Sequence, residues 1–316
     1  MKIILNSLDI SSIPEFDRIF EGIGLLKNVK TDRDLVLNNI KNVDAYLASA
    51  AIKIDKEFLN HADSLKVIGS PSTGTDHMDL NLIAERGIKC FDISEETELL
   101  KSFTATSELA FSLLLSLLRK NISACNDAKN GIWSREKYTG LQLYGKVFGI
   151  LGLGRLGKIS ARIANGFGMK VIAHDIEDIS FPNVEMVNLN TLAQKSDFIS
   201  IHIHLNKATE GLVNMDFLKK MKKNSIIINT SRGKIINELD LLYALQESII
   251  AGAALDVIDG EWLTKQELYK HPLIKYSRNS DKIIISPHIG GATIESIYGA
   301  RLFMAKKVAN FLSELD

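Results

Sequence analysis

The sequence predicts an α/β protein that is built on parallel β-sheets and divided into two domains. Short β-branched runs alternate with helical stretches along almost the whole chain. These runs are nearly continuous in apolar residues, as expected for strands that helices cover on both faces. The chain has 316 residues, of which 46% are hydrophobic and 24% charged, so it can bury the cores of two domains.

Composition limits the partners and the compartment that we expect. Lys+Arg and Asp+Glu number 38 each, so no net charge attracts nucleic acid or an anionic membrane, and we expect neither as a partner. No apolar stretch approaches the roughly 18 residues of a membrane-spanning helix, and residues 1–5 are too short a run for a signal peptide. Cys90 and Cys125 lack metal-ligand spacing, so we expect no metal site, and so few cysteines fit a reducing, cytoplasmic location.

Two series of strands follow one another along the chain. The first has strands at residues 3–5, 45–48 and 67–69, with helical patterns between them. One long helix is predicted over residues 104–129, because its apolar positions are dense and it contains neither Pro nor Gly, and we expect it to bridge two lobes. The second series has strands at 147–151, 170–174, 198–203, 225–229, 251–255 and 282–286, and a last helix is predicted over 294–312.

A glycine-rich turn joins the strand at 147–151 to a helical stretch. A GxGxxG pattern alone is weak evidence, but this one lies between a strand and a helix, where a dinucleotide-binding turn must lie. Its first glycine permits the tight turn, its second lets the backbone approach a pyrophosphate, and its third allows close packing of helix and strand. The helix N-terminus offers N–H groups and partial positive charge to the phosphates. We expect cofactor contacts from Gly152, Gly154, Arg155, Leu156 and Gly157.

The strand after this turn ends at His174 and Asp175. An acidic residue at that position would accept hydrogen bonds from the adenosine ribose hydroxyls and repel a 2′-phosphate. Asp175 therefore predicts NAD rather than NADP as the cofactor. His174 either contacts the adenine side of the cofactor or merely ends the strand.

Three later strands are followed by polar side chains suited to one reaction. Arg232 follows the strand at 225–229, Glu261 lies beyond the strand at 251–255, and His288 follows the strand at 282–286. Ligands bind beyond the carboxyl ends of parallel strands, so these three groups can converge on one cleft.

Oxidation of a 2-hydroxy acid would use all three groups. A guanidinium binds a carboxylate in bidentate fashion, which assigns Arg232 to the substrate. Removal of the hydroxyl proton needs a base that titrates near neutrality, which assigns His288 to acid–base catalysis. A carboxylate partner fixes the imidazole tautomer and favours its protonated form, which is the role expected of Glu261. Each residue alone has an ordinary structural explanation, but together, behind a dinucleotide turn, they predict a dehydrogenase.

At these segments the chain resembles the D-isomer-specific 2-hydroxyacid dehydrogenases, a family that includes phosphoglycerate, glycerate, D-lactate and formate dehydrogenases. The similarity covers nearly the whole chain. It rests on Gly145-Lys146 before the glycine turn, Asn229-Thr230-Ser231-Arg232-Gly233, Ala254-Leu255-Asp256-Val257 with Glu261, and Ser286-Pro287-His288-Ile289-Gly290-Gly291. The resemblance implies hydride transfer between NAD and C2 of a small D-2-hydroxy or 2-keto acid, with the roles given above to Arg232, Glu261 and His288.

The resemblance also implies an architecture of two Rossmann-like domains with parallel sheets. In such proteins the NAD-binding domain, here residues 101–290, is inserted into a discontinuous substrate-binding domain, here residues 1–100 and 291–316. A homodimer is implied as well, formed by the long helix and the region of Trp133.

Further site residues are carried over from the family's motifs. The loop Ser72-Thr73-Gly74-Thr75-Asp76 matches the one whose backbone amides hold the substrate carboxylate, so Thr73 and Gly74 are candidates, with a plain turn as the alternative. Thr209 matches a pyrophosphate contact, and Asp256 matches an acid near the nicotinamide end of the cofactor. Thr230, in the segment before Arg232, is also expected to bind the cofactor.

Several positions depart from the family pattern. His204 and Trp262 stand where proline is usual, and extra residues around 263–267 and 276–281 should form a surface excursion. Phosphoglycerate-type relatives carry arginines where this chain has Ser49-Ala50 and Ser70, which weakens a phosphorylated substrate, although Lys53 could compensate.

The substrate stays open among 3-phosphoglycerate-like, glycerate or hydroxypyruvate and similar acids. A different class of function is a non-catalytic, NAD-sensing binding protein like the corepressors related to this family. The intact set of Arg232, Glu261 and His288 disfavours it. A methyltransferase would need a different glycine pattern and leaves the His288 segment unexplained.

Overall fold

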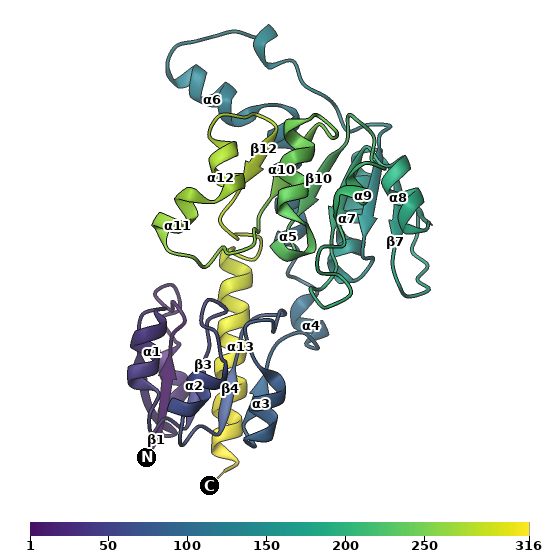
Figure 1. The fold of residues 1–316 in the computed structure, drawn as a ribbon. Coiled ribbons are helices and arrows are strands. Elements are labelled where there is room, and N and C mark those ends of the chain that lie inside the picture. Colours follow the sequence, from purple (N-terminus) through teal and green to yellow (C-terminus); the bar gives the residue numbers. More distant parts are fainter. Residues whose placement is uncertain (316) are drawn as a thin grey trace. The chain divides into compact units, whose positions relative to one another are not determined.

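A computed structural model describes residues 1–315, which form two compact units (Figure 1). The first unit comprises residues 1–103 together with the chain from Thr293 onward, and the second comprises Thr104–Ala292. Among the described residues, no helix combines the length and apolarity that crossing a membrane requires.

The first unit contains a parallel sheet with the strand order β2-β1-β3-β4-β5. Its strands are β1 (Lys2–Asn6), β2 (Gly24–Asn28), β3 (Ala45–Leu47), β4 (Val67–Gly69) and β5 (Lys89–Phe91). Its helices are α1 (Arg33–Asn39), α2 (Lys56–His61), α3 (Leu80–Glu85), α4 (Thr97–Leu100) and α13 (Ile294–Ser313), with a 3₁₀ turn η1 (Asp17–Phe20). The aspartates Asp32, Asp55 and Asp79 begin α1, α2 and α3, and each side chain accepts a backbone N–H of the first turn.

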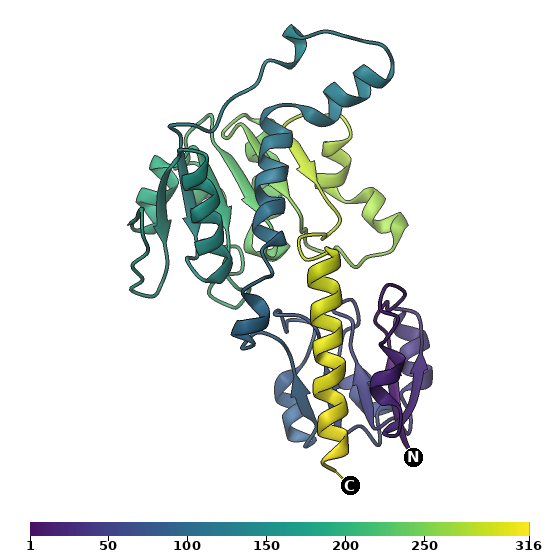
Figure 2. The same cartoon turned by 180° about the vertical axis from the view of Figure 1, so that it is seen from behind.

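Successive residues of these strands enter separate cores, as the alternation of side chains along a strand requires. Ile4 packs with Met304 of α13 on one face of the sheet. Leu5 packs with Phe58 of α2 on the other face. The last helix of the chain, α13, therefore covers the face of the sheet toward which Ile4 of the first strand points (Figure 2).

The second unit contains a parallel sheet with the strand order β12-β11-β10-β9-β6-β7-β8. Its strands are β6 (Val147–Leu151), β7 (Lys170–His174), β8 (Val184–Met186), β9 (Phe198–Ile201), β10 (Ile226–Asn229), β11 (Gly252–Leu255) and β12 (Ile283–Ile285). From β6 the sheet grows in one direction through β7 and β8, and in the other through β9 to β12. The direction of winding reverses at β6 and β9, and ligands of open parallel sheets bind beyond the carboxyl ends of strands at such a point.

Helices cover both faces of this sheet (Figures 1 and 2). On one face Phe111 of α5 stacks on Phe148 of β6 with ring centroids 4.9 Å apart. On the other face Ile199 and Ile227 share a core with Leu241 of α10. The helices are α5 (Ala105–Leu118), α6 (Asn121–Lys129), α7 (Arg155–Gly166), α8 (Leu189–Lys195), α9 (Met215–Leu218), α10 (Glu238–Gln246), α11 (Lys265–Lys270) and α12 (Pro272–Ser277), with 3₁₀ turns η2 (Glu136–Tyr138) and η3 (Gly233–Ile235).

The prediction of one long helix over residues 104–129 is wrong. α5 ends at Leu118 and α6 begins at Asn121, because Lys120 lies in the left-handed region with φ +50°. Seven residues of α5 are buried in its own unit, whereas none of α6 is. The apolar contacts that order α5 stop at its C-terminus, and α6 leads into a segment that extends away from the sheet (Figures 1 and 2).

The predicted strands and the predicted last helix agree with the structure. Three further strands were not predicted. These are β2, β5 and β8, which lie at the edges of the two sheets and carry polar residues such as Lys27 and Glu185. Of the extra residues after Glu261, those at 263–267 are exposed, as expected, and those at 276–281 are exposed or half-buried; the two stretches contribute to the start of α11 and the end of α12. Thr264 and Glu267 form a reciprocal capping box at the start of α11.

Candidate active site

The glycine turn after β6 has no room for side chains at two of its three glycines. Gly152 has φ +96°, and a Cβ there would lie 2.7 Å from the carbonyl oxygen of His202. A Cβ on Gly157 would lie 2.1 Å from the carbonyl oxygen of Gly152. No atom lies within 4 Å of a Cβ built on Gly154, so the backbone at the N-terminus of α7 is open to a ligand.

The carboxylate of Asp175 is bound to this turn. It accepts hydrogen bonds from the backbone N–H of Leu153, at 2.6 Å, and of Glu177, at 3.0 Å. The acid at the end of β7 is thereby held beside the open backbone at Gly154. An open turn for a pyrophosphate with an acid beside it for ribose hydroxyls fits a dinucleotide such as NAD. Arg155 and Leu156 are the first two residues of α7 and are half-buried.

Two threonines expected to bind the cofactor follow neighbouring strands. After β9, the Thr209 hydroxyl donates to the carbonyl oxygen of His204 at 2.7 Å and accepts from the backbone N–H of Asn206 at 2.8 Å, which closes that loop. His204, which stands where the family has proline, is exposed at this loop. After β10, the hydroxyl of Thr230 is buried and has no hydrogen-bond partner among the described residues.

The imidazole of His288 and the carboxylate of Glu261 form a close pair. His288 Nδ1 lies 2.8 Å from Glu261 Oε1, and the two side chains are 31% and 17% exposed. With Nδ1 bound to the carboxylate, Nε2 is the ring nitrogen left for acid–base chemistry. The indole of Trp262 lies beside this imidazole with ring centroids 5.9 Å apart, so the residue that departs from the family pattern borders the pair.

Arg232 lies at the carboxyl end of β10, next to the strand that leads to Glu261. Its backbone is extended and its carbonyl accepts from the Asn229 side-chain amide at 2.9 Å. The following residue, Gly233, packs against the Ile258–Asp259 peptide, where a Cβ would meet backbone atoms at 2.1 Å. The segments that carry Arg232 and Glu261 are therefore in direct contact.

Asp256 fixes the loop that carries His288. This carboxylate is 1% exposed and accepts from the Ser286 hydroxyl at 2.5 Å, the Ile289 N–H at 2.9 Å and the Gly290 N–H at 2.7 Å. His288 between them has φ +53°, an uncommon conformation for a residue with a Cβ. Sequence reasoning gave Asp256 only a cofactor contact and missed this role, for which a charged residue directly after an apolar strand was the available signal.

The loop matched to substrate binding lies in the first unit, after β4. The Ser72 hydroxyl donates to the carbonyl oxygen of Gly74 at 2.6 Å, and Thr73 is exposed. The loop follows the carboxyl end of an internal strand, as a ligand-binding loop of a parallel sheet should.

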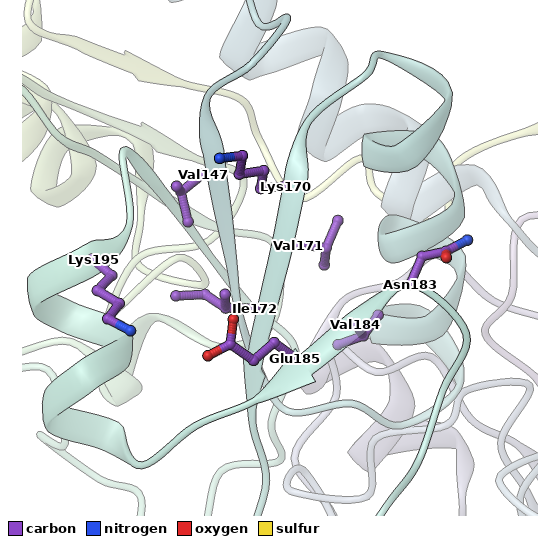
Figure 3. A pocket seen from close by; sticks show the side chains of 8 residues that line it. All are labelled: Val147, Lys170, Val171, Ile172, Asn183, Val184, Glu185 and Lys195. Atoms are coloured by element: carbon purple, nitrogen blue, oxygen red, sulfur yellow. The ribbon is translucent and has the colours of Figure 1, made fainter.

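A separate hollow of about 570 Å³ lies toward the amino ends of strands β6 and β7 in the second unit (Figure 3). It is lined by residues at the starts of β6 and β7 and on β8, with lysines at its rim: Val147, Lys170, Val171, Ile172, Asn183, Val184, Glu185 and Lys195. Because the glycine turn and the His288 loop follow the carboxyl ends of the strands, this hollow is not part of the candidate site. Among the described residues, no cluster of three or more His, Cys, Asp or Glu side chains has an arrangement that would hold a metal ion.

Two family models match the chain. The NAD binding domain of the D-isomer specific 2-hydroxyacid dehydrogenases matches residues 111–290, and the catalytic domain of the same family matches residues 4–137. The chain belongs to this family. It is thus an NAD-dependent D-2-hydroxyacid dehydrogenase, with the two parallel-sheet α/β domains of that fold.

Individual relatives of this dehydrogenase have related activities. Glyoxylate reductase of Thermofilum pendens is 38% identical over 295 residues, which cover 90% of this chain and 82% of the relative. D-3-phosphoglycerate dehydrogenase of Methanocaldococcus jannaschii is 32% identical over 285 residues, which cover 89% of this chain and 52% of the relative. D-lactate dehydrogenase of Aquifex aeolicus, in a structure with NAD and lactic acid, is similar with a TM-score of 0.87 and 26% identity over 99% of this chain and 96% of the other.

Proposed function

We propose that this dehydrogenase reduces small, unphosphorylated 2-keto acids of the glyoxylate and hydroxypyruvate type, with Arg232, Glu261 and His288 as its catalytic residues. The observation that carries the proposal is the 2.8 Å contact of His288 Nδ1 with Glu261 Oε1. It leaves Nε2 as the proton-transferring atom and supplies a carboxylate that stabilises the imidazolium.

The roles follow from the chemistry of each group. Bound NADH supplies the hydride that C2 of the keto acid accepts. The imidazolium of His288 gives its Nε2 proton to the carbonyl oxygen, which becomes the hydroxyl, and in the oxidation direction the neutral imidazole takes that proton back. Arg232 holds the substrate carboxylate through a bidentate ion pair. Thr73 and Gly74 are the proposed substrate-binding residues of the first unit, through their backbone amides.

The preference for an unphosphorylated acid rests on the first unit. Ser70 stands at the position of one family arginine and is fully buried, with its hydroxyl 3.5 Å from His77 Nε2. Lys53, the only cation that the sequence offers in place of the missing arginines in this comparison, is 73% exposed and lies 4.0 Å from the carboxylate of Asp55. Neither supplies a positive charge committed to a phosphate. The 38% identity to a glyoxylate reductase supports the same choice.

The second unit is the proposed NAD-binding domain, which the sequence places at residues 101–290. The first unit is the proposed substrate-binding domain, which the sequence places at residues 1–100 and 291–316. The open backbone at Gly154 receives the pyrophosphate. Asp175 receives the ribose hydroxyls, which favours NAD over NADP. The other proposed cofactor contacts are Gly152, Arg155, Leu156, Gly157, Thr209, Thr230 and Asp256.

A homodimer in the cytoplasm is the proposed state of the enzyme. Large apolar side chains are exposed on α6 and the segment after it, with Ile122 at 55%, Trp133 at 89% and Leu141 at 51%. Burial of this surface against a second copy would remove it from water. Sedimentation of the wild type and of Trp133→Ser tests this, since a monomeric wild type contradicts it.

The function is tested by following NADH and NADPH oxidation with glyoxylate, hydroxypyruvate, pyruvate and phosphohydroxypyruvate. We expect turnover of the unphosphorylated acids with NADH, and loss of turnover with retained NADH binding in His288→Ala. Arg232→Ala should raise KM for the acid. An enzyme that is inactive on the whole panel contradicts the proposal, and equal rates with NADPH contradict the role of Asp175.

A further inference from the structure

A second histidine–carboxylate pair contacts the segment that carries Glu261. His271 Nε2 lies 3.1 Å from Glu238 Oε2, and the two side chains are 9% and 15% exposed. Glu238 is the first residue of α10, and His271 directly precedes α12. Neither residue has a part in the mechanism described above.

Both side chains bind the same peptide backbone. The N–H of Asp259 donates to Glu238 Oε1 at 2.8 Å, and the carbonyl oxygen of Asp259 accepts from His271 Nε2 at 3.1 Å. Both hydrogen bonds use the main chain of Asp259, whose side chain is exposed. The pair thus binds the main chain of Asp259 at both its N–H and its carbonyl group.

Asp259 belongs to a segment that has no regular secondary structure. β11 ends at Leu255 and α11 begins at Lys265, so the chain that carries Glu261 has no strand or helix ladder to hold it. Backbone groups in such a segment must find partners elsewhere, and here side chains supply them. Gly260, with φ +81°, lets the chain turn directly between Asp259 and Glu261.

The protonation of the pair follows from its contacts. An oxygen and a nitrogen 3.1 Å apart need a proton between them, and the Asp259 carbonyl also needs a donor, so His271 carries its hydrogen on Nε2. The Nδ1 atom of His271 is buried and has no hydrogen-bond partner among the described residues. Burial raises the pKa of Glu238 to about 7, although the Asp259 N–H opposes this shift.

We propose that Glu238 and His271 are positioning residues, which hold the Asp259 backbone so that the Glu261 carboxylate meets His288 Nδ1. The inference rests on the proposed function of the His288–Glu261 pair. The same peptide packs against Gly233, so the pair also sets the position of the segment that carries Arg232. A shift of about 1 Å in a catalytic group can cost a hundredfold in rate, so even a small relaxation of this loop should be measurable.

The experiment compares Glu238→Ala, His271→Ala and the double variant with the wild type, using glyoxylate and NADH. Glu238→Gln keeps an acceptor oxygen for the Asp259 N–H and serves as the conservative variant. Glu247→Ala, at the exposed far end of α10, is the matched control. The measurements are kcat and KM, NADH affinity by fluorescence, and the thermal midpoint.

We expect kcat to fall by about tenfold in each alanine variant, with NADH affinity unchanged. In a Glu261→Gln background the alanine substitutions should change kcat by no more than about twofold, since the positioned group is already gone. Glu238→Gln keeps the acceptor for the Asp259 N–H but turns its NH₂ group toward His271 Nε2, so its kcat should lie between those of the wild type and Glu238→Ala.

Variants that have a lower thermal midpoint but wild-type kcat would show a purely structural role and overturn the inference. Effects that multiply with those of Glu261→Gln would overturn it as well. If an alanine variant fails to fold, the comparison of Glu238→Gln with Glu238→Gln/Glu261→Gln decides by the same criterion. A wild type without turnover, or a Glu261→Gln variant with normal turnover, would instead refute the proposed function.

Discussion

Replacement of Asp256 by Asn tests whether this buried carboxylate holds the His288 loop. Oδ1 accepts from the Ser286 hydroxyl and the Ile289 N–H, while Oδ2 accepts from the Gly290 N–H. An amide has one oxygen, so whichever way it turns, its NH₂ group faces a backbone N–H that has lost its acceptor.

The magnitude follows from these contacts. One buried N–H without a partner costs about 1–3 kcal/mol, and the remaining bonds lose the strengthening that a charged acceptor gives. We therefore expect Asp256→Asn to lower the free energy of unfolding by about 3 kcal/mol. Ser286→Ala removes only one donor and should cost about 1 kcal/mol. Asp178→Asn, on an exposed loop of the same unit, should stay within about 0.5 kcal/mol.

The assay combines urea unfolding with steady-state kinetics on the keto acid. Because His288 is held at φ +53°, a loosened loop should release it toward ordinary backbone conformations and reduce kcat by about tenfold or more. An Asp256→Asn variant with wild-type kcat and a loss of less than about 1 kcal/mol would refute the reasoning. Weakened NADH binding as the main effect would favour the cofactor contact instead.

Three further predictions concern other parts of the chain. In Gly157→Ala the new Cβ would meet the Gly152 carbonyl oxygen at 2.1 Å, so this variant should lose about 1–3 kcal/mol of stability. Gly154→Ala should keep the wild-type stability and lose NADH affinity in fluorescence titration. Equal stability of the two variants would contradict this. Burial lowers the pKa of His202 from 6.5 to about 4, so its contribution to stability is present above pH 6.5 and is lost as the pH falls toward 4. Between pH 7 and pH 5 the wild type should lose about 2 kcal/mol more than His202→Gln in denaturant unfolding, and parallel curves would exclude that cause. Lys120→Gly relieves the left-handed residue that separates α5 from α6 and should raise stability by about 0.5–1 kcal/mol, where a decrease would show that the lysine side chain matters more.

The candidate site divides into parts that residue types reveal and parts that they do not. The GxGxxG turn is visible because two of its positions leave no space for a Cβ, so only glycine is possible there. Arg232, Glu261 and His288 are visible because each follows a strand of a parallel sheet, whose carboxyl ends share one edge. Asp256 binds the His288 loop, and Glu238 and His271 bind Asp259, through hydrogen bonds between residues far apart in the sequence. Such contacts leave no local sequence pattern.

The sequence by itself determined the class of the fold and most of its strands. Strands such as β10, Ile226–Asn229, are covered on both faces and must be apolar throughout, so composition alone marks them. Edge strands such as β8 meet solvent on one side and carry polar residues, which hides them. Only the tertiary structure decided that the helix after Thr104 stops at Leu118, because the apolar contacts that order α5 end there. It also decided how Glu261 reaches His288, since an irregular loop takes its shape from the side chains that bind its backbone.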